Sequence, residues 1–355
     1  MRAGHPARLY AFDNSRAIAI VLIVAGHGYG PWVIDTFAEK FIASFITGGT
    51  ALFVLISGFF FHHSFYKTFA WWTFLRAKLI NVGVPYLVLT GVYCVVVGWL
   101  SPERVPVSGA LPWSAGGITD FVRLFGQYAY TGNALPAYWY VPFILLVFAA
   151  SPLFIRFIEL KLPVQLAVLG ASLLMSAIVH RPLDNNNPFH SVLYFSSVYL
   201  LGILTSAYRT HVFAFLQRYA PGIAVLLAVV AGLKVLVDGH HGNLHKADIF
   251  AFKGIDIFLV QKCLQAGLML SLLMRFADRR IPILEYVAER SFAIFFIHNW
   301  VAVLLLKAVP WMGTSGLPGF YVALIIASAS LVASIAVANA LRALLKDRSR
   351  LLIGY

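Results

Sequence analysis

Two ionisable residues in the first long apolar stretch have a spacing that could support chemistry. Arg16 and His27 lie in the segment 13–30, DNSRAIAIVLIVAGHGYG, and the residues between them are nearly all apolar. In an α-helix, steps of 100° bring both side chains to one face, roughly 16 Å apart along the axis. With Arg16 near a membrane surface, His27 would lie near the bilayer centre, where ionisable groups usually face protein or a water-filled cavity. The spacing therefore predicts a site with a cation at its entrance and a histidine at its bottom.

His27 has two possible roles. A neutral histidine within reach of a hydroxyl can act as a general base, whereas a buried histidine satisfied by a neighbour has no chemistry to do. Gly26 and Gly28 flank His27 and would let a backbone or a ligand approach closely, which favours the base. Asp13 precedes the predicted helix and is expected to cap its end, with pairing to Arg16 as the second possibility.

The composition places these residues in a membrane protein. The 355 residues are 60% hydrophobic and 12% charged, whereas soluble domains carry about 25% charged residues. A net charge of +13 would suit a nucleic-acid-binding protein, but an excess of basic residues in cytoplasmic loops explains it better. We therefore expect membrane lipids around the chain and no nucleic-acid partner.

Ten apolar stretches are long enough to cross about 30 Å of hydrocarbon. They predict an all-α, polytopic membrane helix bundle with about ten transmembrane helices, as a single domain over 1–355. Most of the 27 Lys and Arg residues fall in segments that this alternation places on the side of the N-terminus, so both termini are predicted to be cytoplasmic. The predicted spans are 16–34, 41–62, 76–99, 138–158, 163–180, 190–208, 220–237, 254–275, 290–309 and 319–343.

The predicted outer loops are longer than the inner ones. The largest covers 100–137, and two polar loops cover 181–189 and 238–253. His240, His241 and His245 lie in the last of these, in the sequence HHGNLH. This segment lacks the helical H-x-x-x-H spacing and has no nearby cysteine or paired carboxylates. We therefore predict no metal site there.

Several motifs in order along the chain resemble the acyltransferase-3 family of membrane acyltransferases. Arg16 and His27 match the Arg–x10–His first helix of that family. The family also has an F-V-L-S-G-F-like second helix, a basic start to the third helix followed by Pro and Tyr, and a late S-x-x-I-x-x-x-H segment. The matching residues here are Phe53, Val54, Leu55, Ser57, Gly58 and Phe59, then Arg76, Lys78, Pro85 and Tyr86, and finally Ser291, Ile294 and His298.

The resemblance implies an O-acyltransferase of the bacterial inner membrane. Such a protein moves an acetyl group from cytoplasmic acetyl-CoA to a hydroxyl of an extracytoplasmic glycan or lipid-linked sugar. It implies no permanently bound cofactor, because the acyl-CoA is a donor substrate. It also implies that Arg16 and His27 are catalytic, with His27 as the base. The CoA phosphates, which suit the arginine fork, would be bound by Arg16, Arg76 and Lys78. The alternative for Arg76 and Lys78 is that they are ordinary basic residues of a cytoplasmic loop.

Two further residues have both a functional and a structural interpretation. His298 lies about eight residues into the ninth predicted span, where it would position the thioester or bind the pantetheine arm; simple packing is the alternative. Tyr140 ends the run YWY at 138–140, which is typical of an interfacial aromatic belt. Because sugars also stack on such rings, Tyr140 is a candidate substrate-binding residue.

The eighth predicted span carries an unusual polar group. Gln261, Lys262 and Gln265 lie on one side of it, and Gln261 and Lys262 are candidates to line the path of the acceptor. Alternatively, Asp256 in this segment simply pairs with Lys253 one turn away.

Two other functions remain open at this point. The nearer is the same chemistry with another donor, such as succinyl-CoA, acting on an exopolysaccharide. An extra cation near the acyl group would favour it, and Lys262 is the deep candidate. The more distant is a transporter for a glycan or lipid-linked sugar, which would be expected to show an inverted repeat; the sequence shows no such symmetry.

Overall fold

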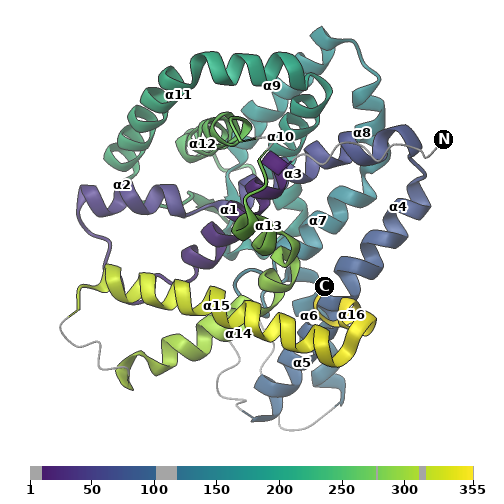
Figure 1. Cartoon of the computed structure of the whole chain (residues 1–355), viewed down its shortest axis with the longest axis vertical. Helices are drawn as coiled ribbons and strands as arrows, with labels where there is room; N and C mark the ends of the chain where they lie inside the picture. Colours follow the sequence, from purple (N-terminus) through teal and green to yellow (C-terminus); the bar gives the residue numbers. More distant parts are fainter. Residues whose placement is uncertain (1–9, 101–117, 277–278, 312–316, 355) are drawn as a thin grey trace.

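The computed structural model describes residues 10–100, 118–276, 279–311 and 317–354, and these are folded almost entirely into helices (Figure 1). The helices surround α1, which lies near the middle of the view. The α-helices are α1 (Tyr10–Gly26), α2 (Phe37–Ile46), α3 (Gly49–Phe60), α4 (Trp71–Lys78), α5 (Val84–Leu100), α6 (Ile118–Thr131), α7 (Tyr140–Ala149), α8 (Ser151–Ile158), α9 (Leu162–Val179), α10 (Pro188–Ala207), α11 (Arg209–Asp238), α12 (Ile257–Met274), α13 (Pro282–Glu289), α14 (Ser291–Ala308), α15 (Gly319–Leu345) and α16 (Ser349–Ile353).

The prediction of an all-α polytopic bundle is confirmed. Among the described residues, eight helices are long and apolar enough to cross a membrane, and the pair α7–α8, bent by 55°, makes a ninth. The predicted number was about ten, and the first predicted span accounts for the difference. α1 has 17 residues and ends at Gly26, not at residue 34, because the glycine-rich segment 26–30 and Pro31 cannot continue a helix.

Several segments predicted as loops have structure of their own. The largest predicted loop contains α6, while its residues 101–117 lie outside the described part. The two polar outer loops meet in a short parallel pair, β1 (Arg181–Pro182) with β2 (His245–Lys246). This pairing fixes the position of the loop that carries Arg181.

The helices around α1 are α3, α12, α13, α14 and α15. α3 and α10 approach each other closely at two glycines. A Cβ on Gly58 would lie 2.1 Å from the carbonyl oxygen of Tyr199, and one on Gly202 would lie 2.1 Å from that of Leu55. Only glycine permits this approach, and the close packing leaves Ser57, next to Gly58, at the wall of a cavity.

Candidate active site

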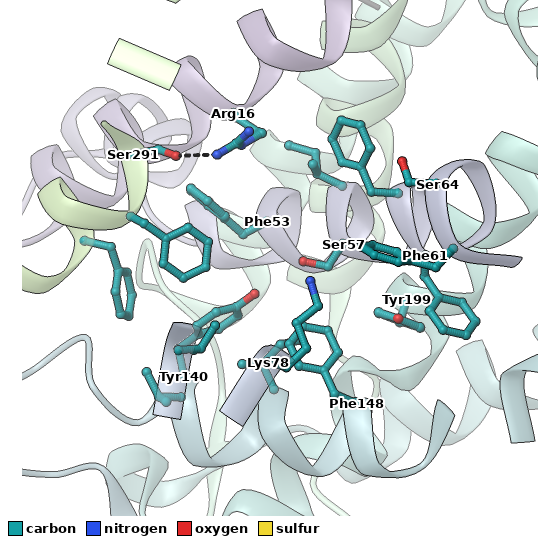
Figure 2. A pocket seen from close by; sticks show the side chains of 18 of the residues that line it. Arg16, Phe53, Ser57, Phe61, Ser64, Lys78, Tyr140, Phe148, Tyr199 and Ser291 are labelled. Carbon is teal, nitrogen blue, oxygen red and sulfur yellow. Dashed lines mark hydrogen bonds between the residues drawn. The ribbon is translucent and has the colours of Figure 1, made fainter. Parts of the chain in front are cut away.

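A cavity of about 330 Å³ lies at the Arg16 end of α1 (Figure 2). We call it the inner cavity. Most of its lining is aromatic or aliphatic, from α3, α4, α7 and the start of α14. Figure 2 shows the Lys78 ammonium and the hydroxyls of Ser57 and Tyr140 pointing into its middle. The polar lining residues are Arg16, Ser57, Ser64, Lys78, Tyr140, Tyr199 and Ser291.

Arg16 is held at the wall of the inner cavity by α14. Its Nη2 donates to Oγ of Ser291 at 3.0 Å, and its Nη1 lies 3.9 Å from a carboxylate oxygen of Asp13. The expectation that Asp13 caps the helix is wrong, because α1 begins three residues earlier at Tyr10. Asp13 therefore pairs with Arg16 within the helix.

Lys78 lies in an aromatic cage. Its Nζ is 4.8 Å from the ring centroid of Phe65, 5.1 Å from that of Phe148 and 5.3 Å from that of Phe74. No carboxylate forms an ion pair with it within the described ranges, so its charge is balanced only by ring faces. Arg76 is exposed and does not line the inner cavity, because residues two apart on a helix point to different sides.

A neighbouring cavity of about 560 Å³ continues from the inner cavity and shares Lys78 with it. Arg350, on the C-terminal helix α16, and Asn81 also line it. Arg350 was not predicted from the sequence, because it resembles any other basic residue of a predicted inner segment. Only the packing of α16 against α5 and α14 brings it beside Lys78.

A third cavity, of about 280 Å³, lies at the opposite end of α1 and contains His27. We call it the outer cavity. It is lined by helix ends and loops, including the break between α2 and α3 and the segments before α7 and α10. Tyr140 and Phe295 line both cavities, with their ring centroids 5.7 Å apart. The inner and outer cavities therefore meet at these two rings.

The hydrogen bonds of His27 define the state of its ring. Its Nδ1 lies 2.8 Å from the carbonyl oxygen of Ile23, and a carbonyl only accepts, so Nδ1 carries the hydrogen. In the neutral ring, Nε2 then holds the lone pair, and it has no partner among the described residues. Nε2 is thus the atom that can accept a proton in the outer cavity.

His298 is fully buried beside His27 and lines neither cavity. Its Nδ1 donates to the carbonyl oxygen of Ile294 at 2.9 Å, so its Nε2 is an acceptor. That atom lies 3.4 Å from Nδ1 of His27. His298 can therefore orient the ring of His27 from behind, which differs from the predicted contact with the donor.

The two ends of the site are connected by α1 and α14 together. Arg16 contacts Ser291 at one end, and His27 contacts His298 at the other. The predicted first-helix motif and the predicted late motif thus lie side by side. In both motifs the polar side chains lie on the faces where α1 and α14 meet. The sequence of one helix does not show which other helix packs against it, so neither motif could be assigned a partner from the sequence.

Gln261 and Lys262 connect helices. Nε2 of Gln261 donates to Oγ of Ser44 at 2.9 Å, and Nζ of Lys262 donates to the carbonyl oxygen of Ser44 at 2.7 Å. Both contacts hold the end of α2 against α12, and neither residue lines the inner or the outer cavity. Asp256 is the N-cap of α12 and accepts from the Tyr194 hydroxyl at 2.7 Å, so it does not pair with Lys253.

Arg181 is the residue of the outer cavity that the sequence analysis did not select. Its guanidinium lies 4.4 Å from the ring centroid of Trp139, at the cavity wall. One signal was available: Arg181 is a basic residue in a segment that the sequence predicts to lie outside, where the distribution of Lys and Arg disfavours it.

The comparisons with known proteins gave one match. The family model described as an acyltransferase domain, that of the acyltransferase-3 family, matches residues 9–339, nearly the whole chain. No curated protein and no solved structure matches the chain.

Proposed function

Because the chain belongs to the acyltransferase-3 family and is a membrane acyltransferase, we propose that it acetylates a glycan or a lipid-linked sugar, using acetyl-CoA and His27 as the base. The membrane would be the bacterial inner membrane, with the donor entering from the cytoplasm. One observation carries the proposal. The cavity at Arg16 and the cavity at His27 lie at opposite ends of α1 and meet at Tyr140 and Phe295.

The inner cavity suits an acyl-CoA donor. Its aromatic and aliphatic lining fits the uncharged pantetheine arm, and Arg16 and Lys78 provide cations for phosphate oxygens. The neighbouring cavity with Arg350 extends this surface toward the end of the chain and offers room for the nucleotide part of CoA. The thioester would then reach the outer cavity between Tyr140 and Phe295.

The chemistry follows from the lone pair on Nε2 of His27. A sugar hydroxyl in the outer cavity gives its proton to Nε2 while its oxygen attacks the thioester carbonyl carbon. The new C–O bond forms as the C–S bond breaks, and the proton passes to the leaving thiolate, which departs as free CoA. His298 keeps the ring in the required orientation throughout.

A succinyl donor is the second candidate, and one observation favours it. Lys262, the cation expected beside the acyl group, does not line the outer cavity, but Arg181 does. A guanidinium at this position could pair with the distal carboxylate of a succinyl group.

The test is donor binding by purified protein in detergent, measured by thermal shift. Acetyl-CoA is expected to raise the melting temperature in proportion to the logarithm of its concentration, and Arg16→Ala is expected to abolish the effect. Arg156→Ala is the matched control, because that side chain is 86% exposed on α8. Release of free CoA on adding a glycan acceptor would then show turnover. If neither acetyl-CoA, succinyl-CoA nor CoA stabilises the protein, a glycan transporter becomes the better explanation.

A further inference from the structure

The outer cavity is built to receive negative charge. Its lining contains Arg181 and His27 and, among the described residues, no Asp or Glu. Burial lowers the pKa of Arg181 to about 10, so its guanidinium remains cationic at neutral pH. Arg181 is half-buried, and the Asp256 carboxylate stabilises its charge from a distance. A carboxylate or phosphate in direct contact would stabilise it further, so an anionic ligand would be bound in preference to a neutral one.

The protein holds Arg181 in place without neutralising it. Its Nε and Nη1 donate to the amide oxygens of Asn185 and Asn243, the second at 3.0 Å. Asn243 in turn donates to the Tyr194 hydroxyl at 2.9 Å, which donates to Asp256 at 2.7 Å. The nearest carboxylate in this chain of hydrogen bonds is therefore two side chains away. The guanidinium is oriented by neutral groups, and its charge stays available to the cavity.

The N-terminus of α3 adds positive potential to the same wall. Gly48, Gly49 and Thr50 line the cavity, and no side chain caps this end of the helix. The first amides of a helix lack intrahelical acceptors, and the helix dipole is positive there, so such an end binds anions. Gly48 has a φ of +82°, which turns the chain between α2 and α3 and brings this helix start to the cavity wall.

Lys262 lies directly behind this turn. A Cβ on Gly48 would come within 2.9 Å of its Cε. Its Nζ donates to neutral oxygens, among them the carbonyl of Ser44 at 2.7 Å and the side-chain amide of Gln265 at 2.8 Å. Lys262 therefore holds the turn between α2 and α3 in place. Because burial disfavours its charged form, the positive potential at the cavity wall comes from Arg181 and the helix start.

We propose that the outer cavity binds an acceptor carrying an anionic oxygen group, a sugar carboxylate or a phosphate ester. This group lies between the Arg181 guanidinium and the N-terminus of α3, while a hydroxyl of the same molecule faces Nε2 of His27. The inference rests on the proposed function, because it names the class of acceptor for that site.

The position of Arg181 assigns the anion to the acceptor and not to the donor. Arg181 lies on β1, among the outer-end loops, and does not line the inner cavity. A donor arriving between Tyr140 and Phe295 comes from the inner cavity, whereas Arg181 is held by the paired loop segments of the outer cavity. Succinyl-CoA is the other source of a carboxylate, and the experiment distinguishes an anion on the acceptor from one on the donor.

The experiment compares methyl glucuronide with methyl glucoside, which differ only in a carboxylate, and adds glucose phosphate as a third probe. Binding to detergent-purified protein is measured by thermal shift, and transfer by release of free CoA from acetyl-CoA and from succinyl-CoA. The variants are Arg181→Gln, Arg181→Lys and the exposed control Arg156→Gln. A thermal shift by acetyl-CoA in each variant shows that it is folded and keeps its donor site.

We expect the wild type to bind at least one anionic probe about tenfold more tightly than methyl glucoside. Arg181→Gln removes that preference, Arg181→Lys keeps part of it, and Arg156→Gln leaves it unchanged. Equal binding of charged and neutral probes, no binding of any probe, or a preference that survives Arg181→Gln would each overturn the proposal. The proposal would also be overturned if Arg181→Gln changed the ratio of CoA release from succinyl-CoA to that from acetyl-CoA but left the acceptor preference unchanged. The anion would then belong to the donor. An anion preference that depends on Arg181, with no CoA release from either donor, supports the anion site and refutes the proposed function.

Discussion

The inner and outer cavities have opposite construction. The inner cavity is formed by helical segments and is lined mainly by rings and aliphatic side chains, with two cations. The outer cavity is formed by helix ends and loops, and its polar groups include backbone at a helix start, His27 and Arg181. An apolar cavity with cations suits the pantetheine arm of CoA, which is attached to phosphates. A polar cavity suits the transfer step, in which a proton moves and charge develops.

This contrast explains why Tyr140 and Phe295 matter. They are the residues common to both linings, so they separate a region that binds the donor from a region where transfer is proposed. Substitution of a residue in the inner cavity should therefore affect donor binding, and substitution in the outer cavity should affect acyl transfer. Substitution of Tyr140 should affect the boundary between the two cavities.

The largest expected effect is that of His27→Ala. Without the base, transfer should fall about 100-fold or more, while acetyl-CoA binding stays unchanged, because His27 does not line the inner cavity. Transfer is measured as CoA release and binding as thermal shift. His211→Ala, at an exposed histidine on α11, is the control. Full transfer by His27→Ala would refute the assigned role.

A matched pair of variants tests whether position or charge matters in the inner cavity. Lys78→Gln removes the cation inside the aromatic cage and should raise the KM for acetyl-CoA about tenfold. Arg76→Gln removes the same charge two residues away, outside the cavity, and should change the KM by no more than about twofold. Equal effects would mean that the two residues contribute only general positive charge.

Tyr140 tests the boundary between the cavities. Tyr140→Phe keeps the ring and should leave transfer within about threefold of wild type, since one hydroxyl is removed. Tyr140→Ala removes the ring that both cavities share and should admit water to the thioester. The expected sign is CoA release without any acceptor, several-fold above wild type. Identical background hydrolysis in the two variants would show that Tyr140 does not separate the cavities.

A small effect is expected for Arg350→Ala. Arg350 is exposed on α16, so its contribution to phosphate binding is screened by solvent and should weaken acetyl-CoA binding by about threefold. The KM for acetyl-pantetheine, which lacks the nucleotide, should not change. A matching loss with both donors would place Arg350 away from the nucleotide.

The sequence predicted the residues of the first helix and late motifs but not their partners. Helical geometry alone relates Arg16 to His27, because both lie on one continuous segment. It gives no relation between that segment and the one containing Ser291 and His298, which contact them. The assignment of Arg76 to the cofactor site rested on charge, and charge does not determine the direction of a side chain.

The sequence by itself determined that this chain is an all-α membrane bundle, where its apolar helices lie, and that Arg16 and His27 lie toward opposite ends of one apolar segment. These features depend on local composition and on the helical period, which act over neighbouring residues. The tertiary structure alone decided that His298 supports His27, that Lys78 and not Arg76 faces the inner cavity, and that Arg181 and the start of α3 form the outer cavity. Those arrangements depend on contacts between distant segments, such as the pairing of β1 with β2 and the packing of α14 on α1, and no local pattern encodes them.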